Sequence, residues 1–292
     1  MPLPELKKII DQQLKANSHI NLFNNNAAEA FVYNVQLWNH SQQALNENER
    51  EELVNYTTEQ ALKTCFGVNQ YYRFSKDAVL ELKQIYRSVF NLSYLTQEDA
   101  MRKHAENIQQ WIRKYQPAYS RYFEKQDETL PEDVPCFEYT PELQIGLLGI
   151  ELHQLKQPVL DIGCGENAHL VLFLKDKGID VHGIDRLCKE SNITHSTDWL
   201  DYRYEPGSWG SIISHLSFTN HFRHQHIQAE GSHEAYARKY MEIINSLKPG
   251  GSFYYSPGLE FIESYLPPEL YGISTHQTGI DGFNATIVTR LT

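Results

Sequence analysis

Apolar residues recur at helical spacing through the first part of the chain, which contains little that alternates like a strand. Leu6, Ile9, Ile10 and Leu14 fall on one face of the first such segment. The same spacing predicts further helices over residues 27–45, 48–65, 75–90 and 96–115. The pattern therefore predicts an all-helical region that ends near residue 125.

Two of these helices have start signals. Ser75 directly precedes KDAVLELKQIY, and Thr96 precedes QEDAMRKHAENIQQWI. Asp99 follows Thr96 at the acidic position of a capping-box-like arrangement. These residues predict where the two helices begin.

A composition change separates the helical region from the rest of the chain. The stretch KQDETLPEDVPCFEYTPE combines acidic residues with three prolines, which is typical of a linker. We expect the boundary within residues 126–140. This divides the chain into a helical domain over residues 1–130 and a second domain over residues 131–292.

From Thr140 onward, apolar runs alternate with helical stretches. The runs lie at residues 158–162, 181–184, 211–216 and 251–256. Such alternation predicts βαβ units around a parallel sheet. The end differs, because YGISTHQT and NATIVTRL are two strand candidates separated only by GIDGF. The sequence thus predicts an α/β fold whose parallel sheet is closed by a C-terminal antiparallel hairpin.

A glycine-rich turn follows the first predicted strand. The residues Val-Leu-Asp-Ile-Gly-Cys-Gly-Glu-Asn-Ala occupy positions 159–168 and lead into a helical run. Glycines there let the backbone turn sharply and let a ligand approach main-chain N–H groups. The turn alone also fits a dinucleotide fingerprint through Gly163, Gly165 and Ala168.

A second acidic residue strengthens the case for a nucleoside-containing ligand. Asp185 ends the strand VHGID, 24 positions beyond Asp161, where a carboxylate can accept both hydroxyls of a ribose. That much still fits NAD. The acid just ahead of the glycines, the SLKPGG turn at residues 246–251 and the final hairpin favour S-adenosylmethionine instead.

On these residues, the region from about 140 to 292 resembles the class I, Rossmann-like S-adenosylmethionine-dependent methyltransferases, whose first strand and loop read VLDxGxGxG. The resemblance implies that Asp161, Gly163 and Gly165 surround the methionine part of the cofactor and that Asp185 holds its ribose. HSTDWLDY resembles the segment that meets the adenine, and SIISHLSF resembles the motif at the methyl-transfer site. The cofactor-binding residues so implied are Asp161, Gly163, Gly165, Asn167, Asp185, Arg186, Asp198, Trp199 and His215.

The sequence departs from the family pattern at two places. Asn167 replaces the third glycine; it tolerates positive φ better than most residues but adds a side chain near the cofactor. Ser214 and His215 stand where many amino-group methyltransferases have Asn or Asp followed by Pro-Pro. The acceptor atom, whether N, O, S or C, is therefore left open.

Four histidines lie at the end of the predicted strand over residues 211–216 or shortly after it: His215, His221, His224 and His226. Methyl transfer from a sulfonium depends mainly on alignment, and a base is optional. Histidine suits an acceptor that must lose a proton. We hypothesise that His215, with His221 second, orients or deprotonates the acceptor. The last three could alternatively be surface residues or metal ligands, but no carboxylate or cysteine has a convincing spacing, so no metal is expected.

The helical region is expected to act as a substrate-recognition cap that excludes water, because the second domain has few insertions beyond its basic sheet. Aromatic residues gather at residues 71–74 and 115–123. Helical-face aromatics usually form core, and some can line a substrate pocket instead. Helical extensions in this family also mediate dimerisation, so a homodimer stays open.

Composition and net charge limit the kinds of partner and the cellular compartment that we expect. The formal net charge is −11, without a basic stripe in either half, which disfavours nucleic acid as a partner. The four cysteines form no CxxC pair, which indicates a reducing compartment. Neither a signal-peptide core nor a membrane-spanning apolar stretch is found, so we expect a cytoplasmic protein without a membrane partner.

The interpretation favoured by the sequence is an S-adenosylmethionine-dependent methyltransferase acting on a small molecule or peptide. Methylation of a protein or RNA is the alternative within enzymes. A non-catalytic cofactor-binding scaffold is favoured if Asn167 obstructs the site. An NAD-dependent oxidoreductase is disfavoured, because nothing after the third strand resembles the second half of a dinucleotide fold.

Overall fold

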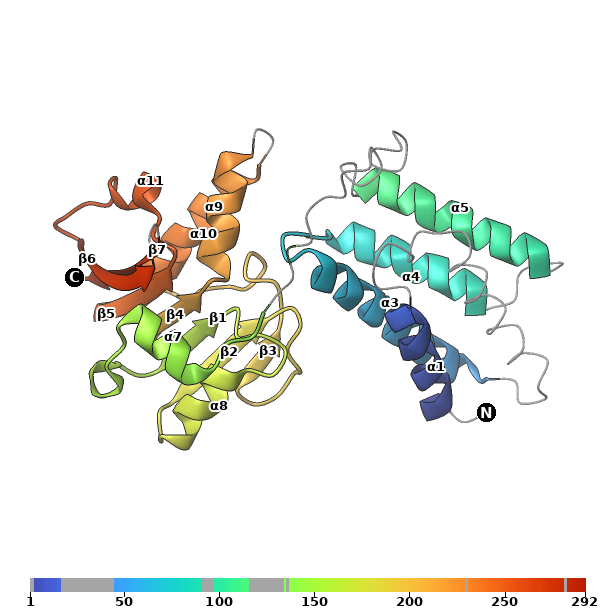
Figure 1. Ribbon diagram of the computed structural model, residues 1–292, viewed down its shortest axis with the longest axis horizontal. Coiled ribbons are helices and arrows are strands. Elements are labelled where there is room, and N and C mark those ends of the chain that lie inside the picture. The colour runs from blue at the N-terminus through green and yellow to red at the C-terminus, as the bar shows by residue number, and fades with distance from the viewer. Residues whose placement is uncertain are drawn as a thin grey trace. The chain divides into compact units, whose positions relative to one another are not determined.

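The computed structural model describes residues 3–16, 45–90, 97–115, 134, 137–228, 231–280 and 283–292. The chain forms two compact units, residues 1–136 and 137–292, and each has its own hydrophobic core (Figure 1). Within the described ranges, no helix combines the length and apolarity needed to cross a membrane.

The first unit consists of helices in its described parts. They are α1 (Leu3–Ala16), α3 (Glu47–Val68), α4 (Lys76–Phe90) and α5 (Gln97–Tyr115). Four of the five predicted helices are thereby confirmed. The fifth, over residues 27–45, lies outside the described residues except for residue 45, and so does most of the aromatic segment 115–123.

Caps and an apolar core fix these helices. Asn46 and Glu49 form a reciprocal capping box at the start of α3, with both hydrogen bonds at 2.9 Å. Ser75 Oγ accepts the backbone N–H of the third residue of α4, as its start signal predicted. Phe74 stacks on the buried Trp111 with ring centroids 5.0 Å apart, so this member of the aromatic group at residues 71–74 packs against the core.

The second unit contains a seven-stranded sheet in the order β3-β2-β1-β4-β5-β7-β6. The first five strands pair in parallel, whereas β7 is antiparallel to both β5 and β6. The strands are β1 (Val159–Ile162), β2 (Val181–Asp185), β3 (Thr194–Ser196), β4 (Trp209–His215), β5 (Leu247–Ser256), β6 (Tyr271–Ile280) and β7 (Phe283–Arg290). This confirms the predicted Rossmann-like sheet with its C-terminal antiparallel hairpin.

Helices cover both faces of this sheet (Figure 1). Alternate residues of the strands point to opposite faces. Val159 packs with α7 (Pro141–Leu148) and α8 (His169–Asp176), whereas Leu160 packs with α9 (Phe218–Ile227) and α10 (His233–Asn245). A short helix, α11 (Glu260–Glu263), follows β5.

Two details differ from the sequence prediction. Strand β3 was not predicted, because three residues at the sheet edge are too short to give an alternation signal. The SLKPGG segment was expected as a turn ahead of a strand. Instead, Leu247 already pairs with Trp209, and the register then jumps so that Ser252 pairs with Ser211. The turn is therefore an irregularity inside β5.

Candidate functional site

Most of the predicted site residues lie at the carboxyl ends of β1, β2 and β4. Strand β1 lies between β2 and β4, so the chain connections leave it in opposite directions at this point. Open α/β sheets bind ligands outside the carboxyl ends of their strands at such a switch point. The strand order thus brings together residues from three separate predicted motifs.

The glycine-rich loop after β1 depends on glycine at two positions. Gly163 has φ of +82° and Gly165 has φ of +77°, both in the left-handed region that side chains disfavour. A Cβ on Gly163 would overlap the side chain of Ser217. A Cβ on Gly165 would lie 2.8 Å from Oε1 of Glu138. Close neighbours therefore require glycine here in addition to the backbone conformation.

Asp161 is a buried carboxyl group near the end of β1. Its side chain is 2% exposed, and its Oδ2 atom has no hydrogen-bond partner among the described residues. Burial, reinforced by the nearby charge of Asp185, raises the pKa of Asp161 to about 7. A buried acceptor without a donor is rare, and it indicates a place where a ligand can supply one.

Asp185, at the end of β2, is held by backbone groups. The N–H of Leu187 donates to Oδ1 at 2.8 Å, and the N–H of Gly165 donates to Oδ2 at 3.1 Å. Burial raises the pKa of Asp185, and these two hydrogen bonds oppose that rise. Each carboxylate oxygen can accept a further bond, so the residue keeps capacity for a ribose hydroxyl.

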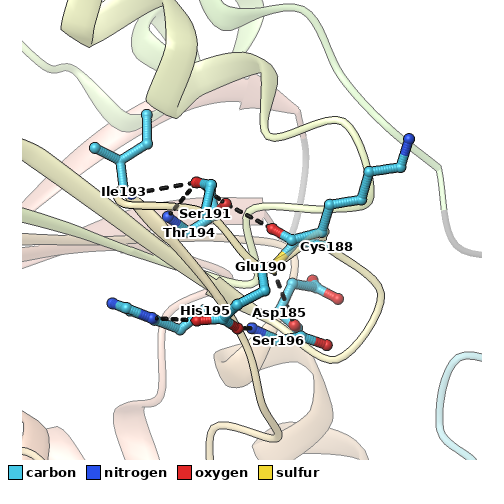
Figure 2. Close-up of polar contacts among 9 residues, drawn as sticks. Asp185, Cys188, Glu190, Ser191, Ile193, Thr194, His195 and Ser196 are labelled. Atoms are coloured by element: carbon cyan, nitrogen blue, oxygen red, sulfur yellow. Dashed lines mark hydrogen bonds and ion pairs between the residues drawn. The ribbon is translucent and has the colours of Figure 1, made fainter.

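The connection from β2 to β3, residues 186–193, is held by its own polar groups (Figure 2). The thiol of Cys188 donates to the carbonyl of Asp185 at 3.2 Å. The Glu190 carboxylate lies 2.8 Å from Nδ1 of His195 and accepts the N–H of Ser196 at 2.8 Å. Parallel strands usually need a longer connection with a helix. These bonds fix a connection that has no helix, and they lead the chain toward the predicted adenine segment.

That segment places Trp199 inside the unit. Trp199 is 7% exposed and makes edge contacts with the rings of Phe218 and His221. A Cβ on Gly163 would lie 3.4 Å from its ring, so Trp199 is next to the glycine-rich loop. Asp198 is partly exposed, and its Oδ1 accepts the N–H of Leu200 at 2.8 Å.

A sharp turn after β4 ties that strand to β1. Leu216 has φ of +53°, a conformation that is unusual for a residue with a branched side chain. The next residue, Ser217, donates from Oγ to the carbonyl of Ile162 at 2.5 Å and lies 2.8 Å from Oγ of Ser214. The turn therefore fixes His215 beside the end of β1.

The two predicted catalytic histidines are both buried. His215 is 8% exposed, its Nδ1 has no partner among the described residues, and its ring meets that of Tyr139 edge-on at 5.0 Å. Burial lowers the pKa of His215 to about 4. His221 is 4% exposed, and burial, with the charges of Arg186 and His224, lowers its pKa well below the ordinary value. Both imidazoles are consequently neutral at pH 7.

The remaining histidines have other neighbours. His226 stacks on Phe261 with ring centroids 3.9 Å apart. In the part of the chain that the structure describes, no group of three or more His, Cys, Asp or Glu side chains is arranged to hold a metal ion.

Arg186, which follows Asp185 directly, is close enough for its charge to act on the carboxyl of Asp185.

Sequence reasoning missed Glu138, whose side chain packs against the glycine-rich loop from outside it. Its Oε1 accepts the N–H of Asn167 at 2.9 Å, and its Oε2 accepts the side-chain amide of Asn167 at 2.7 Å and lies 3.1 Å from Nε2 of His169. Burial would raise the pKa of Glu138, but the bonds from Asn167 and the charge of His169 lower it overall. The segment FEYTPE had been assigned to the linker, although Thr140 caps α7 and so marks an ordered start.

Comparisons with known proteins found matches among solved structures. No protein-family model and no curated protein matches the chain. Solved structures that match include a methyltransferase from Methanosarcina mazei (15% identity, 48% of this chain, 96% of that chain, TM-score 0.32). Another is the N-methyltransferase NodS from Bradyrhizobium japonicum (14% identity, 52% of this chain, 93% of that chain, TM-score 0.35). A third is a Bacteroides fragilis methyltransferase bound to S-adenosylhomocysteine (12% identity, 60% of this chain, 94% of that chain, TM-score 0.38). Because these identities and TM-scores are low, function is inferred below from the residues of this chain.

Proposed function

We propose that this protein is an S-adenosylmethionine-dependent methyltransferase acting on a small-molecule or peptide acceptor. The observation that supports it most is the grouping of Asp161, Asp185 and the loop glycines at the switch point of the sheet. Oδ2 of Asp161, for which the described ranges offer no donor, adds to it. A nucleoside that carries a cationic side chain satisfies both acids at once.

The residues fit the parts of this cofactor. Asp185 retains acceptor capacity for the ribose, and Trp199 lies next to Gly163, where an aromatic ring can border the adenine. Asp161 is buried and close to Asp185, and its Oδ2 has no donor among the described residues, so a cation at the loop stabilises its ionised form. When bound, the cofactor supplies an activated methyl group.

His215 is assigned to orienting the methyl acceptor. Its Nδ1, which has no partner in the described part of the chain, can accept an N–H or O–H from the acceptor. A pKa of about 4 makes this imidazole a weak base, because an efficient base has a pKa near the working pH. Orientation is therefore favoured over deprotonation. His221 contacts Trp199, so we assign it a positioning role through that ring.

Substrate recognition is assigned in part to the helical unit, as a cap that excludes water from the acceptor. Each unit has its own core, so the two can be separated for a test. The scaffold alternative is favoured if Asn167 obstructs the loop. The side-chain amide of Asn167 is bonded to Glu138 at 2.7 Å, which supports the catalytic proposal over that alternative.

Calorimetric titration with S-adenosylhomocysteine, in parallel with NAD, tests the proposal. Wild-type protein should bind the first ligand alone. Asp185→Ala should abolish binding, whereas Asp176→Ala, at an exposed position at the end of α8, should leave it unchanged. Binding justifies a screen of acceptors with radiolabelled cofactor. Binding of NAD alone, or of neither ligand, would refute the proposal.

A further inference from the structure

Asn167 carries a side chain at the third glycine position of the loop, although its own φ is not positive. It stands between Gly165 and Ala168, and both of these have positive φ, +77° and +49°. The loop thus winds through left-handed conformations on either side of Asn167. In the family that the sequence resembles, the corresponding residue is glycine. A side chain here needs a defined location away from the ligand if the loop is to receive one.

Glu138 gives that side chain its location. One carboxylate accepts both the backbone N–H and the side-chain amide of Asn167, at 2.9 and 2.7 Å. Two bonds from one residue to the same partner fix the Asn167 side chain and its peptide group together. The bonds of an ionised carboxylate are stronger than those of neutral groups. His169, in the first turn of α8, adds a third contact at 3.1 Å.

The position of Glu138 in the chain makes this contact informative. It lies 29 residues before Asn167 and is the second residue of the unit that holds the sheet. Its Oε1 lies so close to Gly165 that a Cβ on that glycine would be 2.8 Å away. The carboxylate therefore contacts the loop at two of the three places where the family pattern has glycine.

We propose that Glu138 is a positioning residue that holds the Asn167 side chain and thereby keeps the glycine-rich loop open to the cofactor. Glu138 and Asn167 together replace the missing third glycine. This inference rests on the proposed function. It differs from two other roles for Glu138: direct binding of a cationic group of the cofactor, and obstruction of the site by its carboxylate.

A double-variant comparison separates these roles, with binding of S-adenosylhomocysteine measured by calorimetry. Glu138→Ala should weaken binding about tenfold or more, since it releases the Asn167 side chain. Asn167→Gly should bind within about threefold of wild type, because it restores the family residue. The variant with both changes should also bind within about threefold of wild type. Glu142→Ala, at an exposed acid of α7, is the matched control and should have no effect.

The outcomes are distinct. If the double variant binds as weakly as Glu138→Ala alone, Glu138 contacts the cofactor directly and the inference is wrong. If Glu138→Ala binds more tightly than wild type, the carboxylate obstructs the site and the inference is also wrong. Wild-type protein that binds no S-adenosylhomocysteine refutes the proposed function, and this inference with it. Should Glu138→Ala unfold, Glu138→Gln serves instead, with a smaller loss that Asn167→Gly must still relieve.

Discussion

Replacing Asp161 with asparagine is expected to stabilise the ligand-free protein at neutral pH. The carboxyl group is 2% exposed and its Oδ2 has no donor among the described residues. Burial, together with Asp185, raises its pKa from 3.8 to about 7. In the unfolded chain the group ionises near its ordinary pKa. Above that pKa, folding therefore requires the group to keep a proton, or to bear a buried charge, at a cost in free energy.

The two pKa values give the sign and the size of this cost. Below the ordinary pKa both states are protonated, so the free energy of unfolding is unaffected. The cost grows from there up to about pH 7 and then stays constant at roughly 4 kcal/mol, at about 1.36 kcal/mol per pKa unit. For a unit of this size, roughly 2–4 °C per kcal/mol gives an upper limit of about 8–16 °C in Tm. The amide N–H groups of asparagine also need partners, which lowers the gain.

Thermal unfolding of Asp161→Asn and wild type at about pH 4.5 and about pH 8 tests this expectation. The Tm difference should be small at the lower pH and large at the higher pH. Asp176→Asn, at an exposed position, is the control and should follow wild type. Asp161→Asn should also bind S-adenosylhomocysteine more weakly than wild type does, since the carboxylate is lost. An equal Tm difference at both pH values, or a lower Tm at pH 8, would refute the reasoning.

Three further predictions concern His215, a buried tyrosine and the helical unit. His215→Phe should lower kcat by about 10–100-fold. Wild-type kcat should be independent of pH between about 6 and 8, because the pKa of His215 is about 4. A kcat that falls with the titration of a group near pH 6.5 would contradict this. Tyr255→Phe should lower the free energy of unfolding by about 1–3 kcal/mol in urea, because the hydroxyl lies 2.9 Å from that of Tyr240 and donates to Glu263 at 2.7 Å. Unchanged stability would argue against that network. The fragment 131–292 should bind S-adenosylhomocysteine but lack methyl transfer, and turnover by the fragment would count against the cap.

The sequence was sufficient for the fold because its apolar spacing changes once, from helical periodicity to short runs. Strand β1 is buried throughout, so its run stands out, and the hairpin strands are separated by a short glycine-containing loop. Strand β3 was missed because THS is short and mostly polar. Strand β3 forms because it pairs with Gly183 and Asp185 of β2. That pairing depends on the tertiary fold, so a local sequence pattern does not predict it.

The site was predictable where its residues are close in sequence, and it was not where contacts are distant. Asp161, Gly163 and Asp185 fall within a single strand-loop-helix-strand unit, whose spacing is itself a signal. Ser217 bonds to a carbonyl 55 residues away, and Glu138 bonds to Asn167 across 29 residues. Both are polar residues beside a predicted motif, and their partners follow only from the tertiary fold.

Exceptions to local rules gather at the carboxyl ends of two central strands, β1 and β4. In the described part of the chain, the non-glycine residues with positive φ are Ala168 and Leu216, which follow β1 and β4. The second unit's buried side-chain atoms without partners, among those described, belong to Asp161 and His215, on the same two strands. Strained backbone and unsatisfied polar groups reduce stability, and folded proteins retain them where a ligand or a reaction uses them. Asp161 and Ala168 belong to the glycine motif, whereas His215 and Leu216 lie outside it, at the end of β4. The features at the end of β4 therefore argue for a binding site beyond what the glycine motif alone indicates.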